Sequence, residues 1–211
     1  MAHALKVLAA IAWLGSAGPV GAAQISLFEA GINRDGDQPT PDGVAYDLDA
    51  SGLGTIRVLV KGAGEHFVIG YLDFDIGDVA DDEFGGTVGA PDAGQSWEID
   101  GPGFGFGDLY DNFQNGALDN SNAVPPDSPA DVALGLGWNF ILPSGAVEVV
   151  FHTSLERPDA PFYLWQSEQA SDQTVYLWST ISAVAVPEPG ALALFGIGLG
   201  LLRPSRRRRP Q

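Results

Sequence analysis

Phe162-Tyr-Leu-Trp165 and Thr174-Val-Tyr-Leu-Trp178 are the two runs that decide the fold class of this chain, and residues 166–173 separate them. Aromatic and β-branched residues favour strands, so the two runs are predicted to pair as a hairpin. Alternate side chains of a strand point to opposite faces. The two faces of the hairpin are then a strip of four rings, Tyr163, Trp165, Tyr176 and Trp178, and an apolar set, Phe162, Leu164, Val175 and Leu177.

Short β-type runs recur along the rest of the chain, between frequent breaks at its 28 glycines and 15 prolines. No stretch shows a 3.6-residue apolar period with helix caps, so no helix is predicted in this part of the chain. The pattern predicts an all-β domain, an antiparallel β-sandwich or jelly roll. The other predicted strands are residues 25–28, 55–60, 67–74 and 146–151.

Composition sets limits on the chemistry and on the partners. The 211 residues include no cysteine, which excludes disulfides, thiolate metal sites and cysteine nucleophiles. Residues 24–186 hold 26 acidic residues and four basic ones, a formal charge of −22. Phosphate backbones and anionic lipid surfaces would repel such a domain, so nucleic acid is not an expected partner. The acidic excess either serves solubility or supplies oxygen ligands for Ca²⁺.

Residues 1–23 have the layout of a secretory signal peptide. Lys6 supplies the positive charge, residues 7–14 are apolar, and small residues precede Gln24 at the expected cleavage site. The mature protein is therefore predicted to begin with an exported acidic β-sandwich domain over residues 24–181.

The C-terminal part of the chain is predicted to be a sorting signal. A linker at 182–189 contains Pro187-Glu188-Pro189, and residues 190–211 form an apolar stretch followed by an arginine-rich end. The apolar stretch, residues 190–202, predicts a short transmembrane helix, although it is shorter than the roughly 18 residues of a confident span. Positive residues stay on the cytoplasmic side, which places the acidic domain outside. The basic anchor is Arg203, Arg206, Arg207, Arg208 and Arg209.

This order of motif, apolar stretch and arginine cluster resembles the PEP-CTERM sorting tail of Gram-negative bacteria that secrete exopolysaccharide. The resemblance is limited to the tail. It implies that the membrane enzyme exosortase recognises Pro187, Glu188 and Pro189 and processes the chain nearby. It also implies transit through the inner membrane and periplasm, with transient membrane contact, and a final place at the cell surface or outside the cell.

An acidic run without any basic residue is the first candidate site. Two of its members, Asp73 and Asp75, share one face at the end of a predicted strand, and Gly77 permits a turn after them. The composition suggests calcium, but the EF-hand spacing is not met, so a solvated acidic loop remains the alternative. The run consists of Asp73, Asp75, Asp78, Asp81, Asp82 and Glu83.

A second acidic set follows Gly101-Pro-Gly-Phe-Gly-Phe-Gly107. In an extended strand the glycines and the phenylalanines of this segment would lie on opposite faces, which suggests an edge with Phe104 and Phe106 in the core. The segment matches neither glycine-rich phosphate motif. The second set consists of Asp108, Asp111, Asn112, Asp119 and Asn120.

Catalytic motifs are missing from the sequence. The three histidines are His3, His66 and His152, and neither H-E-x-x-H nor G-x-S-x-G occurs. The sequence therefore predicts a non-enzymatic cell-surface or extracellular-matrix protein associated with exopolysaccharide, with the four-ring strip as its candidate carbohydrate contact. The alternatives are a carbohydrate-active hydrolase, which would use paired carboxylates, and a calcium-dependent carbohydrate-binding module.

Overall fold

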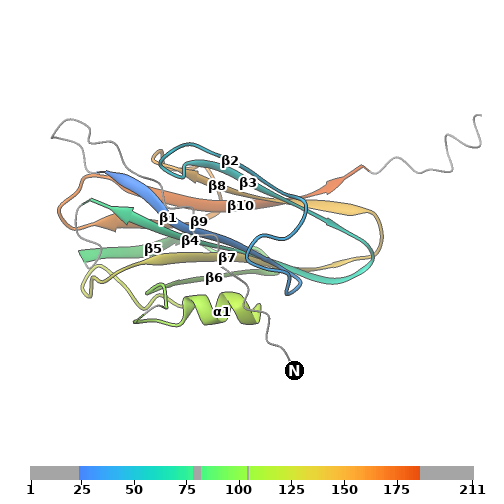
Figure 1. The fold of residues 1–211 in the computed structure, drawn as a ribbon, viewed down its shortest axis with the longest axis horizontal. Coiled ribbons are helices and arrows are strands. Elements are labelled where there is room, and N and C mark those ends of the chain that lie inside the picture. The colour runs from blue at the N-terminus through green and yellow to red at the C-terminus, as the bar shows by residue number, and fades with distance from the viewer. Residues whose placement is uncertain (1–23, 78–81, 104, 186–211) are drawn as a thin grey trace, which may run out of the picture.

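In the computed structural model, the described residues are 24–77, 82–103 and 105–185. Two antiparallel sheets pack face to face, and a short helix covers the outside of one of them (Figure 1). The all-β prediction is confirmed, as an antiparallel β-sandwich. The predicted signal peptide, the Pro-Glu-Pro motif and the apolar tail lie outside the described residues. Within the described residues, no helix has both the length and the apolar character that crossing a membrane requires.

The four-stranded sheet, called sheet A, has the order β1-β4-β7-β6, and the six-stranded sheet B has the order β2-β3-β8-β10-β9-β5. Neighbouring strands in both sheets are antiparallel. The elements are β1 (Ile25–Arg34), β2 (Val44–Leu48), β3 (Gly54–Lys61), β4 (Gly64–Ile76), β5 (Glu83–Gly89), β6 (Gln95–Asp100), α1 (Leu109–Asn115), β7 (Ala133–Leu142), β8 (Ala146–Ser154), β9 (Phe162–Glu168) and β10 (Thr174–Val184).

All six predicted strands are present, and the hairpin of β9 and β10 forms with Tyr176 opposite Trp165. The strands β2, β5, β6 and β7 were not predicted. Two of these are glycine-rich because large side chains occupy the space of a Cβ atom. A Cβ on Gly86 of β5 would lie 2.5 Å from the Trp165 ring, and one on Gly135 of β7 would lie 2.7 Å from Leu109. Packing between elements thus weakened the local strand signal.

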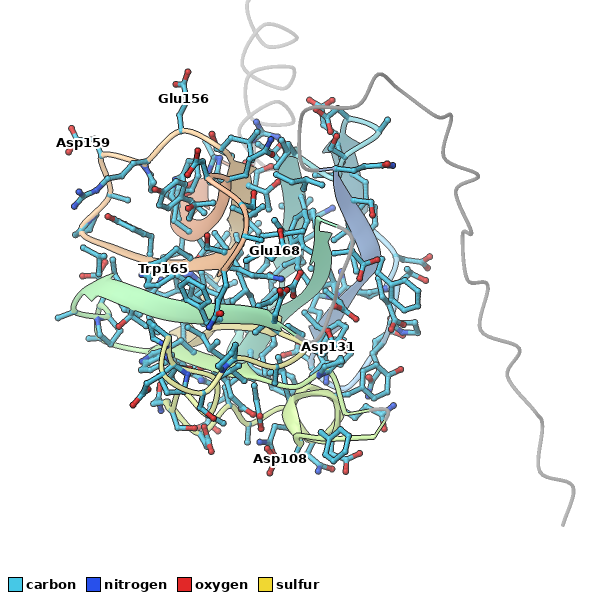
Figure 2. All side chains as sticks on the ribbon, turned by 90° about the vertical axis from the view of Figure 1, so that its left-hand side faces the viewer. Asp108, Asp131, Glu156, Asp159, Trp165 and Glu168 are labelled. Carbon is cyan, nitrogen blue, oxygen red and sulfur yellow. The ribbon has the colours of Figure 1, made fainter. Side chains whose placement is uncertain are left out.

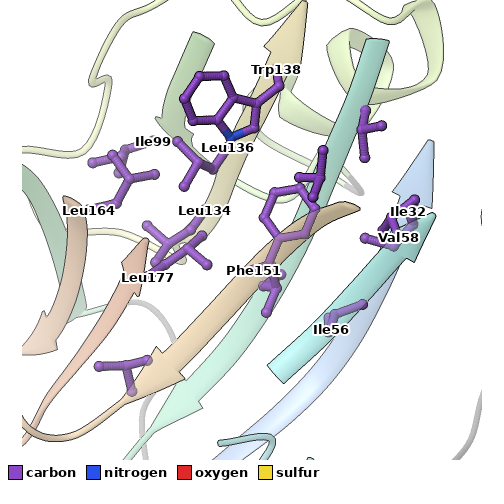
Figure 3. Close-up of a cluster of buried hydrophobic side chains, with 14 of the residues drawn as sticks. Ile32, Ile56, Val58, Ile99, Leu134, Leu136, Trp138, Phe151, Leu164 and Leu177 are labelled. Carbon is purple, nitrogen blue, oxygen red and sulfur yellow. The ribbon is translucent and has the colours of Figure 1, made fainter. Parts of the chain in front are cut away.

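The core lies between the sheets. Phe151 of β8 is fully buried and packs into the centre of the sandwich, and Gly70 of β4 lies against its ring, 3.1 Å from the position of a Cβ atom. Each large apolar side chain buried this way contributes about 1.5–3 kcal/mol. Figure 3 shows Ile32, Ile99, Leu134, Leu136 and Trp138 from sheet A meeting Ile56, Val58, Phe151, Leu164 and Leu177 from sheet B.

The helix α1 covers the outer face of sheet A, where no helix was predicted. It has only seven residues, too few for an apolar period, and its buried residues are the single pair Leu109 and Phe113. Phe113 packs on Ile69 and Tyr71 of β4, so tertiary packing rather than helix propensity stabilises it. Asn33 of β1 fixes the end of the helix by donating a 2.6 Å hydrogen bond from Nδ2 to the Phe113 carbonyl.

Strand β10 is longer than its hairpin partner β9. It pairs with β9 as far as Leu177 and continues beside β8 until Val184 lies opposite Ala146. The sheet therefore includes residues 182–184, which the sequence had placed in the linker. The last described strand is thus an interior strand of sheet B.

Candidate functional site

Three carboxylates converge on the outer face of sheet A, and we call them the carboxylate cluster: Glu98, Asp100 and Asp108. One oxygen of each lies within 4.8 Å of one oxygen of the other two. Glu98 and Asp100 alternate with Trp97 and Ile99 along β6, so the strand points both acids outward. Asp108 directly precedes α1, and Figure 2 shows it beside that helix.

Hydrogen bonds from Asn112 of α1 and from Asp119 hold the Glu98 side chain in place. Its Oε1 accepts a 3.0 Å hydrogen bond from Asn112 Nδ2, and its Oε2 accepts a 3.2 Å bond from the Asp119 backbone N–H. Asp100 accepts from two backbone N–H groups, Gly101 at 2.7 Å and Asp108 at 3.2 Å. The side chains are thus fixed, and each carboxylate oxygen keeps a second lone pair for a ligand.

Two members of the cluster, Glu98 and Asp108, have raised pKa values. Burial of the fully buried Glu98 raises its pKa to about 7, although its hydrogen bonds from Asn112 and Asp119 act in the opposite direction. The pKa of Asp108 is also raised, first by its hydrogen bond with Asp100. Three carboxylates this close together could be balanced by protons or by a cation. Their hard oxygen donors match the ligands that Ca²⁺ prefers.

The second acidic set is only partly gathered here. Asp108 lies in the cluster, while Asn112 and Asp119 bond to Glu98. Asn120 instead accepts from the Trp97 backbone N–H, and Asp111 is exposed. Sequence reasoning missed Glu98 and Asp100, although the polar–apolar alternation of residues 95–100 is a strand signal that points both acids to one face.

The glycine-rich segment before Asp108 is a loop, so the prediction of an edge strand was wrong. Gly103 has φ +97° and Gly107 has φ +79°, conformations that take both residues out of an extended strand. A 3.0 Å bond from the Gly103 N–H to the Phe106 carbonyl closes a turn. Phe106 is 88 % exposed rather than in the core, and Phe104 lies outside the described residues.

The described residues of the predicted calcium site do not share one surface. Asp73 and Asp75 do share one face, the outer face of sheet A, as expected. Glu83 of β5 projects instead into the space between the sheets, where its Oε1 accepts a 2.7 Å hydrogen bond from the Ile76 N–H. Asp82 precedes that strand, with Oδ1 buried. Asp78 and Asp81 lie outside the described residues.

Asp73 continues the acidic surface across sheet A. It pairs with Glu29 of β1 on one side and with Ala133 of β7 on the other, and Ala133 pairs with Asp100. Asp73 is buried, and this burial, together with the charges of Asp131, Asp75 and Glu29, raises its pKa to about 8. The row Glu29, Asp73 and Asp100 therefore crosses the outer face of sheet A.

A pocket of about 570 Å³ contains an Asp–His pair, Asp35 and His66. His66 Nδ1 lies 2.8 Å from Asp35 Oδ2, and Nε2 lies 3.3 Å from the Gly62 carbonyl oxygen. The other oxygen of Asp35 accepts from the Phe67 N–H at 2.8 Å. Both ring nitrogens of His66 lie near acceptors, and Asp35 joins the turn after β1 to β4. Neither ring nitrogen is therefore turned toward a substrate in this geometry.

The four predicted rings share the outer face of sheet B. Trp165, Tyr176 and Trp178 are half-buried, while Tyr163 is buried under Arg157, whose guanidinium carbon lies 5.7 Å from its ring centre. The apolar side of the hairpin lies in the core, as predicted. His152 lies on the same surface and stacks on Trp178, with 4.9 Å between the ring centres and an angle of 9° between the ring planes. We call this surface the aromatic face: Tyr163, Trp165, Tyr176, Trp178 and His152.

A scan against protein-family models, a search of curated proteins and a search of solved structures each found no match to this chain.

Proposed function

We propose that this chain is an exported, non-enzymatic protein of the cell surface or extracellular matrix, and that its aromatic face binds exopolysaccharide. The observation that carries the proposal is the set of three half-buried rings at neighbouring positions of β9 and β10. An aromatic ring presents a negative face, onto which the C–H groups of a sugar ring stack. The strands fix the spacing of the rings, so little entropy is lost on binding.

The ends of the chain supply the rest of the proposal. The secretory leader at residues 1–23 exports the protein, and the tail that resembles PEP-CTERM sorting signals makes exosortase its processing partner. The chain then passes through the inner membrane and periplasm before it reaches the surface. The charge of −22 on residues 24–186 supports a partner other than nucleic acid or anionic lipid.

The test is affinity electrophoresis of the full-length chain through gels that contain bacterial exopolysaccharides. The proposal expects retardation that Trp165→Ala, Tyr176→Ala and Trp178→Ala each reduce. The control is Phe28→Ala, which removes a ring that is 63 % exposed on β1, outside the aromatic face. Equal retardation of all four variants and the parent chain would contradict the proposal. A parallel screen for released sugars decides between binding and hydrolysis, because turnover of any glycan favours the hydrolase.

A second candidate, a calcium-dependent carbohydrate-binding module, is favoured by one observation, the convergence of Glu98, Asp100 and Asp108 within 4.8 Å. In that case Ca²⁺ stabilises the sandwich or contacts the glycan itself. Repeating the electrophoresis with Ca²⁺ and with EDTA separates the two candidates. Retardation lost in EDTA supports the calcium-dependent module, and retardation unchanged in EDTA supports direct binding by the rings.

A further inference from the structure

The two outer faces of the sandwich differ in charge. The strands β4, β6 and β7 of sheet A contain no Lys or Arg. The outward positions of these strands and of β1 carry a set of acids. Burial raises the pKa of one of them, Asp73, and the charges of neighbouring acids add to this effect. An anionic ligand would be repelled by the charged members of this set, to which the buried Asp73 and Glu98 contribute less because their pKa values are raised to about 8 and about 7. The acids are Glu29, Glu65, Asp73, Asp75, Glu98 and Asp100.

Sheet B carries most of the positive charge of the domain. Of the four basic residues within residues 24–186, Arg57 and Lys61 lie at outward positions of β3, and Arg157 lies over Tyr163. Acids also lie on this side: Asp47 of β2 and Glu148 of β8 at outward positions, and Glu156 and Asp159 in the β8–β9 loop. Figure 2 shows the last two projecting outward from that loop.

Arg57 lies next to the aromatic face. Thr55 of β3 pairs with His152 of β8, and His152 pairs with Trp178 of β10, so these three positions form one row across the sheet. Arg57 is two residues along β3 from that row, and its charge contributes to lowering the pKa of His152 after the effect of burial. Two strand spacings, about 9.5 Å, separate β3 from β10.

Arg57 has free capacity for an anion. Its side chain is 50 % exposed, and its Nη1 contacts one acid, Glu148 Oε2, at 3.3 Å. A guanidinium has five N–H donors in a planar fork that matches a carboxylate, so donors remain after this contact. Glu148, whose side chain is 32 % exposed, competes for the same group.

We propose that the ligand of the aromatic face is a carboxylated polysaccharide, with sugar rings stacked on Trp178 and its neighbours and a carboxylate bound by Arg57. This inference rests on the proposed function and names the class of glycan. The net charge of −22 on residues 24–186 repels any polyanion at long range, and salt screens that repulsion. At close range, sheet B is the face on which an acidic polymer meets stacking rings and a guanidinium together. A neutral polymer has no carboxylate for Arg57 to bind.

The experiment compares polygalacturonate with its carboxyl-reduced, neutral form, using the full-length chain and isothermal titration calorimetry. EDTA is present throughout, so that Ca²⁺ cannot bridge the polymer to the acids of sheet A. We expect the carboxylated polymer to bind about tenfold more tightly, as one charge-assisted hydrogen bond provides. Added salt should reduce this difference, because the contact is exposed.

Two substitutions at the ion pair test the residue assignment. Arg57→Gln should weaken binding of polygalacturonate about tenfold and leave binding of the neutral polymer unchanged. Glu148→Gln keeps the arginine and removes its competitor, so it should strengthen binding of the carboxylated polymer. Thermal unfolding checks that both variants are folded.

The outcomes separate the two proposals. Equal affinity for both polymers, with no effect of Arg57→Gln, overturns the carboxylated ligand and leaves the proposed function standing. Binding of neither polymer, with the aromatic variants indistinguishable from the parent chain in every gel, overturns both. Polygalacturonate binding that appears only when Ca²⁺ replaces EDTA also overturns this inference, because it moves the ligand to the carboxylate cluster.

Discussion

Gln166 Nε2 donates a 2.7 Å hydrogen bond to Glu83 Oε2 between the two sheets, where both side chains are fully buried. The same nitrogen donates to the Phe74 carbonyl at 2.6 Å, so the amide joins sheet B to sheet A. Glu168 lies directly opposite Glu83 in the ladder. Burial raises the pKa of Glu83 to about 9, against the weaker opposing effect of its hydrogen bonds.

This arrangement predicts a sandwich that is more stable in acid. Between the ordinary pKa of a glutamate and about 9, folded Glu83 holds a proton that the unfolded chain lacks. The free energy of unfolding should therefore fall with rising pH across that window, by about 1.4 kcal/mol per pH unit for each such group. The measurement is urea denaturation between pH 5 and pH 9.

Glu83→Gln isolates the contribution of this residue. The substitution keeps the shape and removes the titration, so the decline of stability with pH should become shallower while the contributions of Asp73 and Glu98 remain. The exposed Asp159 gives the matched control, and Asp159→Asn should leave the slope as it is. A parent chain that gains stability from pH 5 to pH 9 would show that Glu83 is charged in the folded protein.

Calcium should stabilise the fold through the carboxylate cluster. Ca²⁺ at a hundred times its dissociation constant adds about 2.7 kcal/mol to the free energy of unfolding. Because the pKa of Glu98 is about 7, protons should compete and the effect should be smaller at pH 5 than at pH 8. Thermal unfolding with Ca²⁺ and with EDTA measures both effects.

The calcium prediction has a matched pair of variants. Asp108→Asn removes one oxygen charge from the cluster and should abolish most of the shift, whereas Asp111→Asn changes an exposed acid of α1 outside it. No shift at millimolar Ca²⁺ would sink the prediction. A shift that survives Asp108→Asn and disappears in Asp75→Asn would return the site to the run that begins at Asp73.

The end of α1 depends on Asn33. Asn33→Ala removes the donor to the Phe113 carbonyl and leaves buried backbone groups without it, which should cost about 1–3 kcal/mol in urea denaturation. Gln38 provides the control, since its Nε2 also donates to the Gln114 carbonyl, at 3.1 Å, but in an exposed position. Gln38→Ala should cost far less. Equal losses in the two variants would mean that burial is not the cause.

Processing of the tail is tested by mass spectrometry of the mature protein from hosts with and without exosortase. We expect the C-terminus to lie near Pro187-Glu188-Pro189 only where the enzyme is present, because we propose this motif as the recognition site of exosortase. An intact end through Gln211 in both hosts would refute the prediction.

Local patterns predicted the parts of this fold that local chemistry determines. The alternation in residues 162–165 and 174–178 correctly separated the core-facing Leu164 and Leu177 from the outward rings. It did not predict that Tyr163 is covered by Arg157, because that contact joins a loop to a sheet. The hydrogen bond from Asn112 to Glu98 and the inward turn of Glu83 likewise depend on tertiary structure.

Strand β10 also determines how the molecule would carry load. It lies between β8 and β9, presents Tyr176 and Trp178, and continues to Val184, three residues before Pro187-Glu188-Pro189 in the sequence. A pull on that end acts along the strand, so the backbone hydrogen bonds to β8 are strained in shear and resist together. A force on the C-terminal end of β10 would therefore reach the aromatic face through one continuous strand.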